Sequence, residues 1–257
     1  MRVRKAVIPA AGRGTRLGDL TLTQPKELLP IVDKVALDYI IEEALGAGIE
    51  EICLITSAEK VLSFEKHLRK HRVQIDYLIQ HKPLGLGHAL SVAEDWVGSD
   101  DFLLMLPDEL YLSVETSEGL IKYFDKVRKN VVTVFPVNQS QISSYGIPEI
   151  EIVGAESKVL RIMEKPEAVE PTLNKAIAGR YLLSKNIWGA LKRVPPSING
   201  EIELTTALNF IANENDLLAY EIKGTRFDIG SKKGWLEANL LLAKNKYGER
   251  WLGSLLK

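Results

Sequence analysis

Apolar residues in the first half of the chain follow two alternating patterns. One pattern repeats at i, i+3, i+4, i+7 and i+8, and it places on a single helix face Leu37, Ile40, Ile41, Ala44 and Leu45. The other is a short continuous apolar run, which is typical of a strand buried on both faces. Such runs predict strands at 3–9, 52–56, 75–79, 102–106 and 131–137, with further helices at 61–71, 88–96 and 120–127. This alternation predicts a parallel sheet with helices on both faces.

The second half of the chain has a different pattern. The runs at 147–153 and 159–163 predict a hairpin or an antiparallel edge, and further strands are expected at 176–183 and 217–222. Helices are expected after a cap at Ser184, over 201–212 and around Trp235 near the C-terminus. No linker rich in Gly, Ser or Pro interrupts the chain. We therefore expect one α/β domain over 1–257, with a doubly wound, mostly parallel sheet that 1–138 and 139–257 share.

Composition narrows the class of protein. The 257 residues include 33 basic and 34 acidic side chains, and the net charge of −1 argues against a nucleic-acid binder and against attraction to acidic membranes. No run of 18 apolar residues occurs, so no segment is expected to span a membrane. The single cysteine, Cys53, lies in an apolar run and is expected to be a buried strand residue. These features predict a cytoplasmic protein that binds neither nucleic acid nor membrane.

Candidate chemistry begins in the loop after the first predicted strand. Segment 10–16 reads Ala-Ala-Gly-Arg-Gly-Thr-Arg. Small residues there, and the glycines at 12 and 14, let the backbone approach a ligand and direct its N–H groups toward it. Arg16 and Lys26 add positive charge near the same place. A strand that leads into a glycine turn with two cations suits a phosphate group.

Two other interpretations of this loop compete. One is an ordinary turn with cations on the surface. The other is a dinucleotide-binding fingerprint, for which Asp33 lies at the distance of a ribose-binding carboxylate. However, Leu17 stands where the third glycine belongs, and Pro25 and Pro30 exclude the helix that must follow. No Walker A spacing occurs in the chain. We therefore favour a nucleoside triphosphate loop of another kind.

The run from Gly12 to Arg16, followed at 25–30 by Pro-Lys-Glu-Leu-Leu-Pro, resembles the sugar-1-phosphate nucleotidylyltransferases, and among them the UTP–glucose-1-phosphate uridylyltransferases. The resemblance extends over nearly the whole chain. It implies a Rossmann-like nucleotidyltransferase fold with a small antiparallel sugar-binding addition. It also implies that the protein transfers a uridylyl group from UTP to glucose 1-phosphate with Mg²⁺. The sugar phosphate is then the nucleophile, so no Ser/His/Asp or Cys/His set is needed.

The resemblance assigns nucleotide binding to segment 1–138. Arg16 and Lys26 would hold the triphosphate. Gln80 follows a predicted strand, and an amide side chain can both donate to and accept from the edge of uracil. The nucleotide-binding residues it implies are Ala10, Ala11, Gly12, Gly14, Thr15, Gln80, Gly85 and Gly87. A loop with a helix start explains 80–89 equally well from the residues alone, and His88 is expected to be a helix-start residue, not a catalyst.

The resemblance assigns the sugar phosphate to segment 139–257. Lys165 would hold its phosphate, and the sugar-binding residues would be Gly146, Glu164, Gly179 and Glu201. A turn, a surface pair and a helix-start acid are the plainer explanations of Gly146, of Glu164 with Lys165, and of Glu201.

Two aspartates are implied to hold the metal. Asp108 ends the predicted strand at 102–106, and ligands of open α/β sheets gather beyond such strand ends. Asp228 ends a shorter strand-like run, and we expect parallel neighbouring strands to bring the two carboxylates together. A turn or capping aspartate is the alternative for Asp108. Glu109, which follows it, is expected to be solvated.

The chain departs from the family pattern in several places. Gly18 and Asp19 replace a usual proline region, Leu22 replaces a usual lysine, and Thr206 replaces a frequent aspartate. The segment between 55 and 80 is also short. These departures leave the choice of sugar and the formation of a homo-oligomer open. Thymine in place of uracil, a catalytically silent sugar-nucleotide sensor and an NAD-dependent dehydrogenase remain the alternatives.

Overall fold

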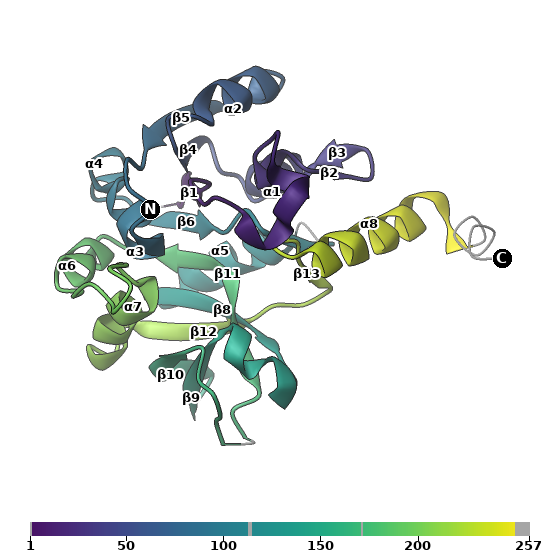
Figure 1. Ribbon diagram of the computed structural model, residues 1–257. Coiled ribbons are helices and arrows are strands. Elements are labelled where there is room, and N and C mark those ends of the chain that lie inside the picture. Colours follow the sequence, from purple (N-terminus) through teal and green to yellow (C-terminus); the bar gives the residue numbers. More distant parts are fainter. Residues whose placement is uncertain (1, 113–114, 171, 250–257) are drawn as a thin grey trace.

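The computed structural model describes residues 2–112, 115–170 and 172–249. Its centre is a nine-stranded sheet in the order β5-β4-β1-β6-β11-β8-β12-β10-β9 (Figure 1). All of these strands run in one direction except β10 and β11. The strands are β1 (Lys5–Pro9), β4 (Glu51–Thr56), β5 (Gln74–Ile79), β6 (Phe102–Met105), β8 (Asn130–Pro136), β9 (Gly146–Val153), β10 (Glu156–Glu164), β11 (Lys175–Leu183) and β12 (Leu217–Glu221). The predicted α/β class with a mostly parallel sheet is confirmed.

Helices cover both faces of the sheet (Figure 1). One face carries α1 (Ala36–Gly46), α2 (Val61–Leu68) and α5 (Glu115–Val127), and the other carries α3 (Gly85–Ser91), α4 (Glu94–Val97), α6 (Asn186–Lys192) and α7 (Leu204–Asn213). The helix α8 (Lys232–Tyr247) extends from the body near two short ribbons. These pair β2 (Pro30–Ile31) with β3 (Lys34–Val35), and β7 (Glu109–Tyr111) with β13 (Arg226–Asp228). No described helix is long and apolar enough to cross a membrane.

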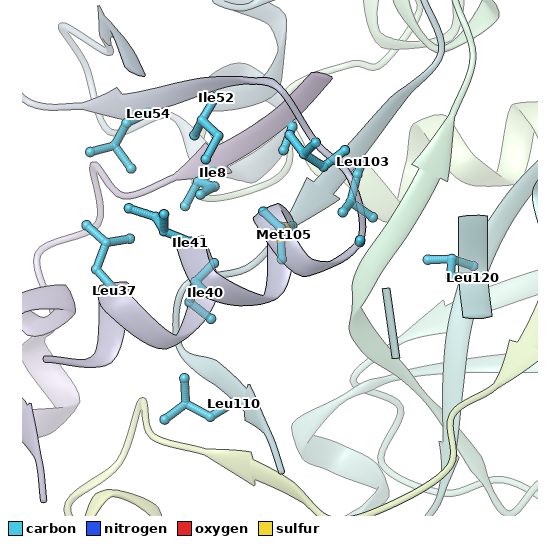
Figure 2. Close-up of a cluster of buried hydrophobic side chains, with 14 of the residues drawn as sticks. Ile8, Leu37, Ile40, Ile41, Ile52, Leu54, Leu103, Met105, Leu110 and Leu120 are labelled. Carbon is cyan, nitrogen blue, oxygen red and sulfur yellow. The ribbon is translucent and has the colours of Figure 1, made fainter. Parts of the chain in front are cut away.

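The strand sequences explain why both faces are covered. Side chains alternate across a strand, and in β4 Ile52 and Leu54 enter one core while Cys53 and Ile55 enter the other. Figure 2 shows the first core, where such strand residues meet the face of α1 that carries Leu37, Ile40 and Ile41. Central strands such as β4 and β6 therefore read as short apolar runs. Cys53 is fully buried as predicted, and burial raises the pKa of its thiol to about 12.

Most element boundaries differ from the predicted ones by a few residues. The helix predicted at 88–96 is instead two helices, α3 and α4. The predicted cap at Ser184 is wrong: Lys185 occupies the N-cap of α6, and the Ser184 hydroxyl donates to Asn186 Oδ1 at 2.8 Å. The helix α7 begins at Leu204, after the 197–203 loop. The loop after β1 contains the 3₁₀ turns η1 (Thr15–Thr21) and η2 (Lys26–Leu28).

A buried aspartate joins α1 to α2 and the turn that follows it. The Asp38 side chain is 1% exposed, and its Oδ1 lies 2.9 Å from His67 Nε2 and 2.8 Å from His71 Nε2. Its Oδ2 accepts from Lys70 Nζ at 2.6 Å. Burial alone would raise the pKa of Asp38, but hydrogen bonds from Lys70, His71 and His67 outweigh it and lower the pKa to about 2.

We expect Asp38→Asn to lower the free energy of unfolding by about 2 kcal/mol at pH 7. The folded pKa lies below the usual 3.8, so this stabilisation is complete above a pH of about 4 and is lost as pH falls toward about 2. Urea unfolding of both proteins between pH 7 and about 2.5 should therefore show a difference in unfolding free energy that narrows only below a pH of about 4. The exposed Asp95→Asn is the control, with a change within about 0.5 kcal/mol. A difference that stays constant down to a pH of about 2.5 would contradict the assignment.

Candidate active site

A cleft of about 840 Å³ lies beyond the carboxyl end of β6. One end of its wall contains Arg16, Asp108 and Asp228. The other end contains side chains from β9, β10 and the start of α7, together with residues of the 197–203 loop. The cleft therefore lies between the two segments that the sequence assigned to different substrates. Its volume is within the usual range for a small-molecule site.

Opposite charges meet at the first end of the cleft. Lys26 Nζ donates to Asp108 Oδ2 at 2.7 Å, and Arg16 Nη2 lies 3.9 Å from the same oxygen. A Cβ atom placed on Gly230 would lie 2.8 Å from Arg16 Nη2 and 3.1 Å from both Asp108 Oδ2 and Asp228 Oδ1. Arg16, Asp108 and Asp228 thus meet around one glycine, and Lys26 joins them through Asp108.

The two aspartates differ in their electrostatic surroundings. Burial would raise the pKa of Asp108, but the Lys26 ammonium outweighs it and holds the pKa below the usual value. Burial raises the pKa of Asp228, and the charge of Asp108 raises it further. The site therefore contains one carboxylate, Asp108, that is paired with a cation, and a second, Asp228, that Asp108 repels. An added cation would reduce that repulsion.

The way in which these aspartates meet differs from the predicted one. They do not end parallel neighbouring strands. Instead β7 and β13 form a separate antiparallel ribbon, in which Asp228 pairs with Glu109. The Ile229 N–H donates to the Asp108 carbonyl oxygen at 2.8 Å and fixes the register next to the cleft. A three-residue strand is too short for its pairing to be read from an apolar pattern.

The prediction that Glu109 is solvated is wrong. Its side chain is 9% exposed and accepts from Arg226 Nε at 2.6 Å and Arg226 Nη2 at 2.7 Å. It also accepts from the Tyr111 hydroxyl and the Gly179 N–H, each at 2.8 Å. A carboxylate with four donors is the buried centre of the ribbon, because burial without such partners would be costly.

Arg226 is a residue of the cleft that the sequence analysis missed. Its guanidinium lies 4.1 Å from the ring centre of Phe135 and 5.1 Å from that of Tyr145. It lines the cleft beside Asp228. The alternation of side chains along a strand could have predicted this position. Arg226 is two residues from Asp228 in β13, so both side chains lie on the same side of the strand.

The loop after β1 supplies only Arg16 to the wall of the cleft. Ala10 is buried, and its N–H donates to the Ile55 carbonyl oxygen at 2.7 Å. Gly14 has a φ of 70°, which a residue with a side chain adopts only with strain. A Cβ on Gly12 would meet no atom within 4 Å. Nucleotide contacts by Ala10, Ala11, Gly12, Gly14 and Thr15 stay a prediction.

Two other predicted glycines pack against protein. A Cβ on Gly85 would lie 2.9 Å from the Ile202 carbonyl oxygen, and one on Gly87 would lie 2.7 Å from it. The Gly87 N–H donates to that oxygen at 2.9 Å. Gln80 is buried, with its Nε2 3.2 Å from the Gly85 carbonyl oxygen and 2.9 Å from His88 Nδ1. Contact with the loop before α7 explains both glycines, and their binding of a nucleotide stays a prediction.

The second end of the cleft contains Gly146, Glu164, Lys165 and Glu201. Glu164 Oε2 accepts from the Thr205 hydroxyl at 2.6 Å, and Lys165 Nζ lies 3.4 Å from Glu164 Oε1. Lys165 has a φ of 43°, in a left-handed region where non-glycine residues are concentrated at functional sites. Its N–H donates to the Tyr145 carbonyl oxygen at 3.1 Å, which holds the turn in place.

Gly179 is not among the residues that line the cleft. A Cβ there would lie 2.9 Å from both Glu109 Cδ and Leu106 Cβ. The residue has no Cβ because the buried Glu109 carboxylate packs against it and accepts its N–H. Sugar binding by Gly179 therefore has no support from its position, in contrast to Gly146.

The described residues contain no group of three or more His, Cys, Asp or Glu side chains placed to hold a metal ion. The protein offers two carboxylates at the first end of the cleft. Mg²⁺ is usually bound by one or two carboxylates together with substrate phosphates and water. The donor set is consistent with a magnesium ion that binds together with a phosphorylated ligand.

Comparisons with known proteins extend over nearly the whole chain. A family model described as nucleotidyl transferase matches residues 5–245. A UTP–glucose-1-phosphate uridylyltransferase of Mycoplasma genitalium is 36% identical over 271 residues, covering 95% of this chain and 93% of the relative. One of Bacillus subtilis is 36% identical, with 93% of this chain and 89% of the relative covered.

Solved structures give the same result. A UDP-glucose pyrophosphorylase complexed with UDP-glucose has a TM-score of 0.88 and 32% identity, and the match covers 95% of this chain and 99% of that one. A UTP-bound UGPase from Acinetobacter baumannii has a TM-score of 0.87 and 30% identity, with 99% of both chains covered.

We expect Glu109→Gln to lower the free energy of unfolding by about 3–5 kcal/mol, because it leaves the buried Arg226 guanidinium without a counter-charge. Glu214→Gln is the matched control, since its ion pair with Arg193 is 52% exposed on both sides and should contribute less than about 1 kcal/mol. Chemical denaturation of both variants measures the difference. Equal small losses would show that Glu109 does not organise the ribbon.

Proposed function

The chain belongs to the nucleotidyl transferase family, and we propose that it transfers a uridylyl group from UTP to glucose 1-phosphate and releases pyrophosphate. One observation carries the proposal. A single cleft has Arg16 and two carboxylates at one end, with Lys26 bound to one of those carboxylates from behind the wall, and a lysine with a glutamate at the other end. Its uridylyltransferase relatives align over nearly their full length, which supports UTP and glucose 1-phosphate as the substrates.

The proposed reaction needs positioning more than protein nucleophiles. A phosphate oxygen of glucose 1-phosphate attacks the α-phosphorus of UTP in line, the new O–P bond forms, and pyrophosphate leaves with the electrons of the broken bond. Arg16 and Lys26 would neutralise the triphosphate, and Lys165 would hold the attacking phosphate. Glu164 and Glu201 would accept hydrogen bonds from the sugar hydroxyls. All five residues except Lys26 line the cleft, and Lys26 contacts it through Asp108.

A divalent cation, which we propose to be Mg²⁺, would be held by Asp108 and Asp228. When bound, it would neutralise charge on the phosphates of both substrates. The Lys26 ammonium already occupies Asp108 Oδ2 at 2.7 Å. Lys26 therefore keeps Asp108 ionised before substrates arrive. When the triphosphate binds, the Lys26 ammonium would donate to a phosphate oxygen.

The direct test is pyrophosphate release from each of several nucleoside triphosphates with a set of hexose 1-phosphates. UTP with glucose 1-phosphate and Mg²⁺ should give the highest kcat/KM, and UDP-glucose should be the second product. A preference for thymidine triphosphate would change the assigned base. Binding of UDP-glucose with no product from any pair would identify a sugar-nucleotide sensor.

Asp108→Asn and Asp228→Asn should each lower turnover about a hundredfold or more, because a bound cation contributes several kcal/mol to the transition state. If both act through one ion, the double variant should lose far less than the product of the single losses. Turnover at saturating Mg²⁺ measures this, with Asp95→Asn as the unaffected control. Strictly multiplicative losses would show that the two residues do not share an ion.

Thermal midpoints of the same variants separate catalysis from folding. Asp108→Asn should lower the midpoint, since Lys26 loses its partner. Asp228→Asn should not lower it, since the change removes a carboxylate that Asp108 repels.

A further inference from the structure

A lysine with no role in the proposed reaction donates hydrogen bonds to the loop that follows β1. Lys60, the residue before α2, has a side chain that is 11% exposed. Its Nζ donates to the Ala10 carbonyl oxygen at 3.0 Å and to the Gly12 carbonyl oxygen at 2.5 Å. One ammonium group therefore fixes two alternate peptide units of the predicted nucleotide loop.

A buried glutamate faces the same ammonium group. Glu27 belongs to the turn η2, and its side chain is 0% exposed. Its Oε2 lies 3.4 Å from Lys60 Nζ, and its Oε1 is buried with no hydrogen-bond partner among the described residues. Burial raises the pKa of Glu27, while the charges of Lys60 and Lys26 oppose that shift. The pair joins the loop to the turn that carries Lys26.

The two carbonyl contacts determine where the loop directs its N–H groups. No described peptide bond is cis, and in a trans peptide the C=O and the following N–H point in opposite directions. Because the Ala10 and Gly12 carbonyls point to Lys60, the N–H groups of Ala11 and Arg13 point away from it. Gly12 and Arg13 are exposed, and the space a Cβ of Gly12 would occupy is open. Two backbone donors thus face the solvent side of the loop.

We propose that Lys60 is a positioning residue of the nucleotide site, which orients the Ala11 and Arg13 N–H groups toward the bound nucleotide. Glu27 is its buried counter-charge. The inference rests on the proposed function in taking that nucleotide to be UTP. Lys60 itself does not touch the ligand, since its ammonium is on the opposite side of the peptide planes. It acts by holding donors in place before binding, which reduces the ordering cost of the complex.

A purely structural role for Lys60 predicts a different result. If Lys60 served only to neutralise Glu27, then removal of both charges would restore folding and binding together. Under the positioning role, removal of both charges restores folding but leaves the loop carbonyls without their donor. The double variant Lys60→Met with Glu27→Gln separates the two, because Met keeps the apolar stem and no charge stays buried.

The experiment measures thermal midpoint, UTP affinity and hydrogen exchange of the loop amide of Ala10, whose N–H donates to the Ile55 carbonyl oxygen, in four proteins. These are the wild type, the double variant, Lys60→Met and Lys66→Met, which removes an exposed lysine of α2 and should match the wild type. The double variant should keep a near-normal midpoint, bind UTP at least about tenfold more weakly, and exchange the Ala10 amide faster. Lys60→Met alone should in addition lower the midpoint, because it leaves Glu27 buried without its ion pair.

Wild-type affinity for UTP and unchanged loop exchange in the double variant would overturn the inference. Failure of the wild type itself to bind UTP would instead count against the proposed function. The loop-exchange comparison still tests Lys60 in that case, because it needs no ligand. A double variant with normal exchange would then reject the positioning role on its own.

Discussion

The geometry of the cleft depends on one buried carboxylate. Glu109 accepts hydrogen bonds from β13 through Arg226 and from β11 through Gly179, and its own backbone carbonyl accepts from Arg180 Nη2 at 3.0 Å. Arg180 is fully buried and pairs with Glu43 of α1 at 2.6 Å. Burial of these charged groups is costly unless their donors and acceptors are matched, so the network favours the arrangement of the ribbon that presents Asp228.

Charge at the cleft is arranged before any substrate is present. Lys26 is fixed by Asp108, and the lysine and the carboxylate each hold the other in its ionised form. Asp228 has no ion pair among the described residues, and burial with the nearby Asp108 charge makes its ionised form costly. An arriving phosphate offers Lys26 a second anion, and a cation would relieve Asp228. The charges of the unliganded site are therefore arranged to suit the proposed binding of a phosphate together with a cation.

The sequence predicted the layers of the fold well, because burial on both faces leaves continuous apolar runs that can be read directly. It also predicted that Arg16, Lys26, Asp108 and Asp228 converge. It did not predict the ribbon of β7 and β13, whose strands are too short for a pattern, nor the burial of Glu109. From the sequence alone, Glu109 next to the candidate metal-binding Asp108 is expected to be solvated. Its partners, Arg226 and Gly179, lie far away along the chain.

The glycines also show what cannot be predicted from the sequence. A sequence marks where a side chain is absent but not what occupies the space. At Gly179 the space is filled by Glu109, and at Gly87 by the Ile202 carbonyl, so these two positions are explained by packing. At Gly230 a Cβ would instead meet Arg16, Asp108 and Asp228, three charged groups from separate parts of the chain. A substitution of Gly230 with alanine would therefore act on the charged end of the cleft and not on the core.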